Sequence, residues 1–184
     1  MATPFVENRP VVAPPLHRNR AGGAVEALCA VAGIVLAIIG LAGASRFFDA
    51  IADIVVGAAF LFEVWTLTAR GHDDRGMWAE RAAGWTGVVL GILALLGLAP
   101  TVFAPISVIV FGAGLIFGVG LLSRAARVVA GLCAVVLGIL ALLQLDPRTL
   151  TNIAVIAVAG ILLVTGPAVA RSTHGMRGMR APAI

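Results

Sequence analysis

The sequence predicts an all-α, polytopic integral membrane protein with six transmembrane helices, arranged as three tandem helical-hairpin repeats. Three observations predict this. Hydrophobic residues make up 60% of the 184-residue chain and charged residues only 12%, whereas a soluble domain is about 25% charged. The apolar residues gather in six runs, each near the roughly 20 residues that a spanning helix needs. A motif rich in glycine and leucine also recurs along the chain at similar intervals.

The recurring motif is clearest in residues 87–100 and 134–147, which share the run Val-Val-Leu-Gly-Ile-Leu-Ala-Leu-Leu. A weaker copy occupies residues 33–43. The copies start 54 residues apart (33 to 87) and then 47 residues apart (87 to 134). Each copy is followed by a second apolar run, so the chain is interpreted as one helical hairpin used three times. The repeats cover about residues 26–70, 80–124 and 127–170.

The six apolar runs are the predicted spanning helices, taken in chain order. None of them alternates between apolar and polar residues with a period of two, which argues against transmembrane strands. The fifth run has 16 residues and reaches spanning length only when Ala125, Ala126 and Leu145 are included. The runs are Ala27–Ala44, Phe47–Leu67, Ala82–Ala99, Val102–Leu122, Val128–Leu143 and Leu150–Ala170.

The arginines orient the chain in the membrane. All 13 basic residues are arginine, and 11 of them lie in the two tails and in the second and fourth connections. The other two, Arg46 and Arg148, lie at the opposite side of the predicted helices. Positive charge favours the cytoplasmic side, which predicts a multi-pass protein of the bacterial cytoplasmic (inner) membrane with both termini in the cytoplasm. The predicted parts are a Pro/Arg-rich cytoplasmic tail (1–21), the six-helix membrane domain (22–170) and a second cytoplasmic tail (171–184).

Small residues spaced four apart mark several of the predicted helices. Such stripes let two helix backbones approach closely, and this packing carries much of helix association in lipid. We expect the stripes to hold the six helices together around a pseudo-threefold arrangement, and the alternative is that one of them forms a dimer face. The stripes are Gly33 with Ala37, Gly87 with Gly91, Gly114 with Gly118, and Ala134 with Gly138.

Three carboxylates inside the runs are candidates for an ion- or proton-responsive site, because an ionisable group within a membrane span is a functional hypothesis by default. Asp49 and Asp53 open the second helix four residues apart and therefore share a face. Helix capping is the alternative for both, with Arg46 as an expected partner of Asp49. Glu63 lies near the cytoplasmic end of the same helix, where Arg70 is the expected partner.

The remaining reactive side chains form no catalytic or metal-binding pattern. Glu26 is expected at the membrane interface, and Cys29 and Cys133 are expected to be buried, inert thiols. The sequence contains no nucleophile–base arrangement and no phosphate-binding loop, so the protein is expected not to be an enzyme. It implies no cofactor or metal, although a pigment or quinone could still bind between helices through apolar contact.

These features together resemble the bacterial six-helix membrane proteins of the HdeD type, which are built from a short repeat of unknown function. The resemblance rests on Gly-x-x-x-Gly-Ile-Leu-Ala-Leu-Leu, on the closing Pro100 and Pro147, and on a small residue near the middle of each second helix. It covers about Glu26 to Ala170, and the first repeat departs from it because Gly43 and Ala44 stand where the others have proline. The resemblance implies a membrane fold and an association with acid resistance, and it carries over no catalytic residue. The small residues in question are Gly57, Gly112 and Ala159.

Two classes of function follow from these observations. The first is a non-enzymatic membrane protein that acts as an accessory or scaffold subunit of a larger assembly, or as an acid-stress factor. Its expected partners are membrane lipids and other membrane proteins, or a second copy of the chain, and nucleic acid is not expected. The alternative is a small proton- or ion-linked transporter or channel that uses Asp49, Asp53 and Glu63.

Overall fold

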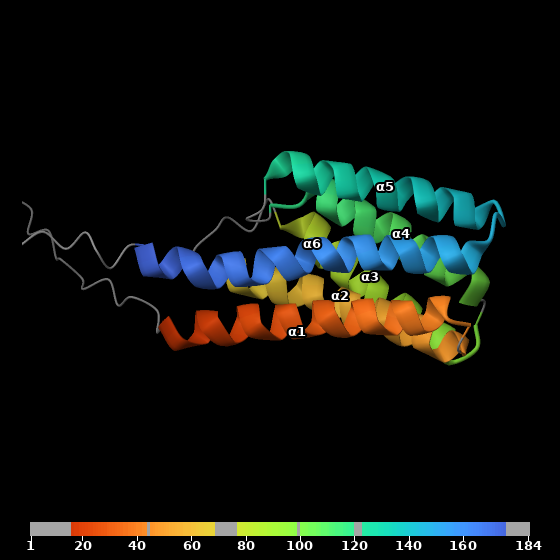
Figure 1. Cartoon of the computed structure of the whole chain (residues 1–184), viewed down its shortest axis with the longest axis horizontal. Helices are drawn as coiled ribbons and strands as arrows, with labels where there is room; N and C mark the ends of the chain where they lie inside the picture. The colour runs from red at the N-terminus through yellow and green to blue at the C-terminus, as the bar shows by residue number, and fades with distance from the viewer. Residues whose placement is uncertain (1–15, 44, 69–76, 99, 120–122, 176–184) are drawn as a thin grey trace, which may run out of the picture.

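A computed structural model describes residues 16–43, 45–68, 77–98, 100–119 and 123–175 (Figure 1). This part of the chain contains six α-helices and no strand. The predicted all-α class is therefore confirmed. The helices are α1 (Leu16–Leu41), α2 (Arg46–Thr68), α3 (Trp78–Leu95), α4 (Pro100–Phe117), α5 (Arg124–Leu142) and α6 (Pro147–Gly175).

Four of the described helices are long and apolar enough to cross a membrane. Helix α4 contributes a shorter apolar stretch, Thr101–Phe117. Helix α3 has 18 residues and carries Glu80 and Arg81 in its first turn. The four long segments are Gly23–Leu41, Arg46–Thr68, Arg124–Leu142 and Pro147–Thr165.

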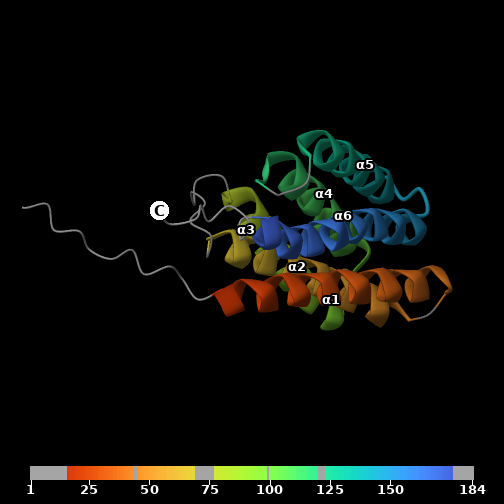
Figure 2. The ribbon, with the colours of Figure 1, turned by 60° about the vertical axis from the view of Figure 1, so that its left-hand side comes forward.

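The six helices form one elongated bundle in which α2, α4 and α6 contact one another. Each of α1, α3 and α5 packs on the outside against two of these inner helices: α1 on α6 and α2, α3 on α2 and α4, and α5 on α4 and α6. Helix α2 is accordingly 61% buried, against 28% for the apolar segments of α1 and α5. Consecutive helices run in opposite directions along the bundle (Figures 1 and 2).

The two ends of the bundle differ, and each is given a name here. Helix α1 begins and helix α6 ends at the same end, where both project past the other helices (Figure 1); this is the terminal end. The turns that join α1 to α2, α3 to α4 and α5 to α6 lie at the opposite end, the turn end. Helix α1 begins inside the segment assigned to the amino-terminal tail, because Pro15 is the last residue of that tail that opposes helix formation.

Close backbone contacts join the inner helices to the outer ones. A Cβ atom on Gly57 of α2 would lie 2.7 Å from the carbonyl oxygen of Gly84 on α3. A Cβ atom on Gly112 of α4 would likewise lie 2.6 Å from the carbonyl oxygen of Gly131 on α5. Only glycine permits helix axes to approach this closely, so these positions fix where α3 and α5 sit on the inner helices.

The small-residue stripes expected from the sequence face neighbouring helices inside the bundle. Their glycines meet side chains or carbonyl groups of adjacent helices, and Ala37 and Ala134 are fully buried. This is the placement that packing within one chain requires, whereas a dimer face would leave the stripes on the outer surface. The contacts are Gly33 with Val56, Gly87 with Phe111, Gly91 with Ile54, Gly114 with Ala83, Gly118 with Glu80, and Gly138 with Ile109.

The three outer helices end in the same way at the turn end. Gly43, Gly97 and Gln144 follow α1, α3 and α5 with φ angles of 88°, 79° and 63°, the left-handed conformation that closes many helices. Pro100 and Pro147 were expected to stop the preceding helices. They instead occupy the first positions of α4 and α6, where a missing N–H is harmless and the fixed φ of proline suits a helix.

Candidate functional site

The terminal end buries four ionisable side chains from four different helices. Glu26 of α1, Glu63 of α2, Glu80 of α3 and Arg127 of α5 are each no more than 2% exposed. Burying a charge is costly unless it is paired, so four such groups at one level of the bundle make this the leading candidate site. Glu63 is the only one of them that sequence reasoning selected.

The guanidinium of Arg127 joins three helices to α5. Its Nη1 donates to Oε1 of Glu63 at 3.2 Å, and its Nη2 donates to Oε1 of Glu80. Its Nε donates to the carbonyl oxygen of Leu115 on α4, at 3.4 Å. Arg127 therefore connects α2, α3 and α4 through hydrogen bonds that are all shielded from solvent. Arg70, the expected partner of Glu63, lies outside the described residues.

The second oxygen of each paired carboxylate has no such contact. Oε2 of Glu63 and Oε2 of Glu80 are buried, and neither has a hydrogen-bond partner in the described part of the chain. Gly118 of α4 makes room for the Glu80 side chain, because a Cβ atom at that position would collide with it. We name Glu63, Glu80 and Arg127 the carboxylate–guanidinium cluster.

A cavity of about 420 Å³ adjoins this cluster. Arg127 lines it together with Arg124, which is exposed, and with the last turn of α4. Arg127 thus faces the buried carboxylates on one side and the cavity on the other.

Glu26 adds a further carboxylate to the same region. Its Oε1 accepts a hydrogen bond from Oγ1 of Thr165 on α6, at 2.9 Å, and this contact links the first and last helices. The sequence placed Glu26 at the membrane interface as the start of the first helix. That expectation is wrong because α1 begins ten residues earlier, at Leu16, so Glu26 lies in the interior of the helix and is fully buried.

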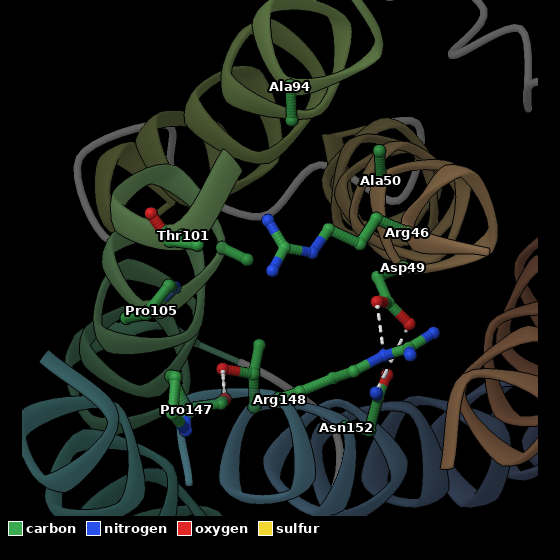
Figure 3. Close-up of a pocket in the computed structure, with 11 residues that line it drawn as sticks. Arg46, Asp49, Ala50, Ala94, Thr101, Pro105, Pro147, Arg148 and Asn152 are labelled. Carbon is green, nitrogen blue, oxygen red and sulfur yellow. Dashed lines mark hydrogen bonds and ion pairs between the residues drawn. The ribbon is translucent and has the colours of Figure 1, made fainter. Parts of the chain in front are cut away.

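A separate polar site lies at the turn end (Figure 3). Asp49 of α2 accepts a hydrogen bond from Nε of Arg148 at 3.0 Å and another from Nδ2 of Asn152 at 3.2 Å. Arg148 thus occupies the position beside Asp49 that the sequence assigned to Arg46, because the first turn of α6 packs across from α2. These residues line a cavity of about 70 Å³, into which the Arg46 guanidinium points (Figure 3).

Asp53 lies one helical turn further into the bundle than Asp49 and is 1% exposed. Neither of its carboxylate oxygens has a hydrogen-bond partner among the described residues. The Ser107 hydroxyl lies beside Asp53, but it donates to the carbonyl oxygen of Phe103 at 2.9 Å. Asp53 is therefore the least compensated acidic side chain that the structure describes at the turn end.

An apolar layer separates Asp53 from Glu63. The two carboxylates are ten residues apart on α2, which corresponds to about 15 Å along a helix. Between them lie the fully buried Val56 and Phe60, and the Phe60 ring stacks on Phe111 of α4 with ring centroids 5.5 Å apart. The buried polar groups consequently form two sites, one toward each end, and not one continuous path.

Sequence reasoning missed Glu80 and Arg127 because both lie at the ends of apolar runs, where charged residues ordinarily meet lipid headgroups. One signal was available. Glu26, Glu80 and Arg127 are separated by 54 and 47 residues, the same spacings that separate the copies of the repeated motif.

The cysteines and the other possible ligands add no metal site to this picture. Cys133 is exposed on the outer face of α5, so the expectation that it is buried is wrong, and Cys29 is half-buried. Among the described residues, no group of three or more His, Cys, Asp or Glu side chains is placed to hold a metal ion.

Comparison of the chain with models of protein families, with functionally characterised proteins and with solved structures finds no match. The resemblance to proteins of the HdeD type thus stays a prediction from the repeated motif.

Proposed function

We propose that this chain is a six-span protein of the bacterial inner membrane, with both termini in the cytoplasm, that acts without catalysis. In this proposal it is an accessory or scaffold subunit of a larger membrane assembly, or an acid-stress factor of the HdeD type. The outward faces of the outer helices support a lipid environment, because they expose large apolar side chains throughout. Examples are Leu28 and Val35 on α1, Val89 on α3, and Val129 and Val136 on α5.

The helix contacts support the threefold repeat on which the proposal builds. Each outer helix packs against two inner helices, as three equivalent hairpins around one axis require. The glycine contact between Gly57 and Gly84 has a counterpart between Gly112 and Gly131. Repetition of this kind favours α3 and α4 as spanning helices too, since they correspond to α1 and α2 of the first hairpin.

The observation that carries the scaffold function is the distribution of buried charge. The buried carboxylates and guanidinium at the terminal end bond helices to one another, and an apolar layer that contains Phe60 and Phe111 separates them from the polar groups of the turn end. A channel or pore needs a continuous polar path. Helices bonded in this way instead form a fixed body whose apolar outer surface is available to other membrane proteins.

The experiment that tests this function is extraction of the protein from its native host in mild detergent, without overexpression, followed by mass spectrometry of co-migrating proteins. We expect a stoichiometric larger assembly, or a strain phenotype limited to acid challenge. Migration as an isolated chain together with proton or ion flux in reconstituted vesicles would contradict the proposal.

Asp53 favours a second candidate, a small proton- or ion-linked transporter. Its unpartnered carboxylate lies one turn below Asp49, close to the cavity at the turn end that Asp49 lines. Ionisable groups in such positions mark transport paths in many membrane proteins. This candidate predicts flux that Asp53→Asn abolishes, whereas the scaffold function predicts no flux in either form of the protein.

A further inference from the structure

We propose that the carboxylate–guanidinium cluster is a proton-binding site that holds one proton between Glu63 and Glu80. This inference goes beyond the proposed function, because it depends on the cluster itself and not on whether the protein scaffolds or transports.

The first argument is the balance of charge. Two carboxylates face one guanidinium, and the side chains of Glu63, Glu80 and Arg127 are at most 3% exposed. A net negative charge enclosed in this way is costly, because neither water nor a counter-ion reaches it. One proton makes the cluster neutral and gives one of the two unpartnered oxygens a hydrogen to carry.

The surrounding groups do not supply the missing positive charge. Glu26 of α1 approaches Glu63 closely enough to act on it electrostatically, and it adds negative charge. Helix α4 contributes the Leu115 carbonyl and the bare Cα of Gly118, and α6 contributes the Thr165 hydroxyl. All of these are uncharged.

A proton fits this site better than a metal ion does. The Arg127 guanidinium already lies between the two carboxylates and takes one oxygen from each, so a metal cation there would be repelled by a fixed positive charge. The described residues also offer no group of three acidic, histidine or cysteine ligands. A proton needs only one carboxylate oxygen, and Oε2 of either glutamate is available.

Access to the site is one-sided. The cavity of about 420 Å³ reaches Arg127 from the terminal end, whereas the apolar layer around Phe60 and Phe111 closes the cluster toward the turn end. The bound proton thus exchanges with the compartment at the terminal end alone. Release of the proton leaves two carboxylates of like charge between α2 and α3, which loosens the contact that Arg127 maintains between them.

The test is infrared spectroscopy of the purified full chain in lipid nanodiscs, in an Asp53→Asn background that removes the buried carboxylate of the turn end. We expect the carbonyl stretch of a protonated carboxylic acid at neutral pH. This signal should be lost in both Glu63→Gln and Glu80→Gln, because each variant leaves one carboxylate facing one guanidinium. Absence of the signal in the Asp53→Asn protein, or its persistence in both glutamine variants, would overturn the proposal.

A second measurement keeps the test decisive if a glutamine variant folds poorly. At neutral pH an exposed glutamate in the unfolded chain is ionised, so the folded chain holds one proton more than the unfolded chain. Stability must then decrease as the pH is raised, by about tenfold in the folding equilibrium per pH unit. Unfolding of the Asp53→Asn protein in detergent should show this dependence, and stability that is unchanged or rises with pH contradicts a bound proton.

Discussion

At the scale of single residues, Arg127 is the side chain on which the terminal end depends. Its guanidinium is the one buried cation in the described chain, and it serves two carboxylates and a backbone carbonyl. Arg127→Met would leave Glu63 and Glu80 facing each other without a counter-charge. Removing one member of a buried ion pair costs about 3–5 kcal/mol, and we expect a loss of that order in the free energy of unfolding in detergent.

Arg124 provides the matched control for this substitution. It lies one turn before Arg127 on the same helix, but its side chain is exposed. Arg124→Met should leave the unfolding free energy within about 0.5 kcal/mol of the wild type. Equal effects of the two substitutions would show that the buried cluster contributes nothing specific to stability.

Asp53 should behave in the opposite way. Its carboxylate is buried and has no hydrogen-bond partner in the described chain, and the corresponding positions of the other two repeats carry Val108 and Val155. An unsatisfied buried polar group costs about 1–3 kcal/mol, so Asp53→Val should raise the unfolding free energy by about that amount. Thermal unfolding in detergent measures the change, and a decrease would reveal a favourable contact for Asp53.

At the scale of elements, the ends of the outer helices differ in one residue. Gly97 closes α3 and Gln144 closes α5, both with a positive φ, a conformation that is costly for residues other than glycine by roughly 1–2 kcal/mol. Gln144→Gly should therefore stabilise the protein by about 1 kcal/mol. The mirror-image control, Gly97→Ala, should destabilise it although no atom lies within 4 Å of the added Cβ. Unfolding curves that move in the same direction for both variants would contradict this account.

The contact between α2 and α3 depends on Gly57. A side chain at that position would meet the carbonyl oxygen of Gly84 at 2.7 Å and the amide nitrogen of Val88 at 2.9 Å, and neither backbone atom can move independently of its helix. Gly57→Leu should therefore destabilise the bundle by at least about 1–3 kcal/mol. Gly160→Leu on α6 is the control, because nothing lies within 4 Å of its Cβ position; similar melting temperatures for the two variants would be inconsistent with close packing of α2 on α3.

The helices themselves were predictable from the sequence, because a continuous apolar run reports helix formation in lipid without reference to any neighbour. Their polar ends were less so. Leu16 to Glu26 read as a tail and an interface, yet these residues extend α1, since no proline interrupts them. The sequence likewise suggested that Pro100 and Pro147 stop helices, and they start them.

The buried cluster shows why the candidate site was harder to predict than the fold. Glu63 was recognisable alone because it interrupts an apolar run. Its partners Glu80 and Arg127 lie 17 and 64 residues further along the chain, and their burial depends on how three hairpins pack. A pairing rule based on nearby charges selected Arg70 and Arg46, whereas tertiary packing brings Arg127 to Glu63 and Arg148 to Asp49.

At the scale of the whole molecule, the six helices place apolar side chains outward and their ionisable groups inward. This arrangement suits lipid as the surrounding solvent, and the charges that remain at the surface orient the chain. Four helices are long enough to span a membrane by length and composition, so the account depends most on α3 and α4. If both also cross, the turn between them lies outside the cytoplasm, on the same side as Arg46 and Arg148.

The most direct measurement is therefore cysteine labelling of that turn in intact bacteria. In a Cys29→Ala, Cys133→Ala background, Leu98→Cys reports the turn between α3 and α4, and Ser45→Cys and Ser123→Cys report the turn end and the terminal end. We predict that a membrane-impermeant maleimide labels Leu98→Cys and Ser45→Cys in intact cells, and Ser123→Cys only after the inner membrane is opened. Labelling of Leu98→Cys only after opening, like Ser123→Cys, would show that α3 and α4 do not cross and would contradict the six-span account.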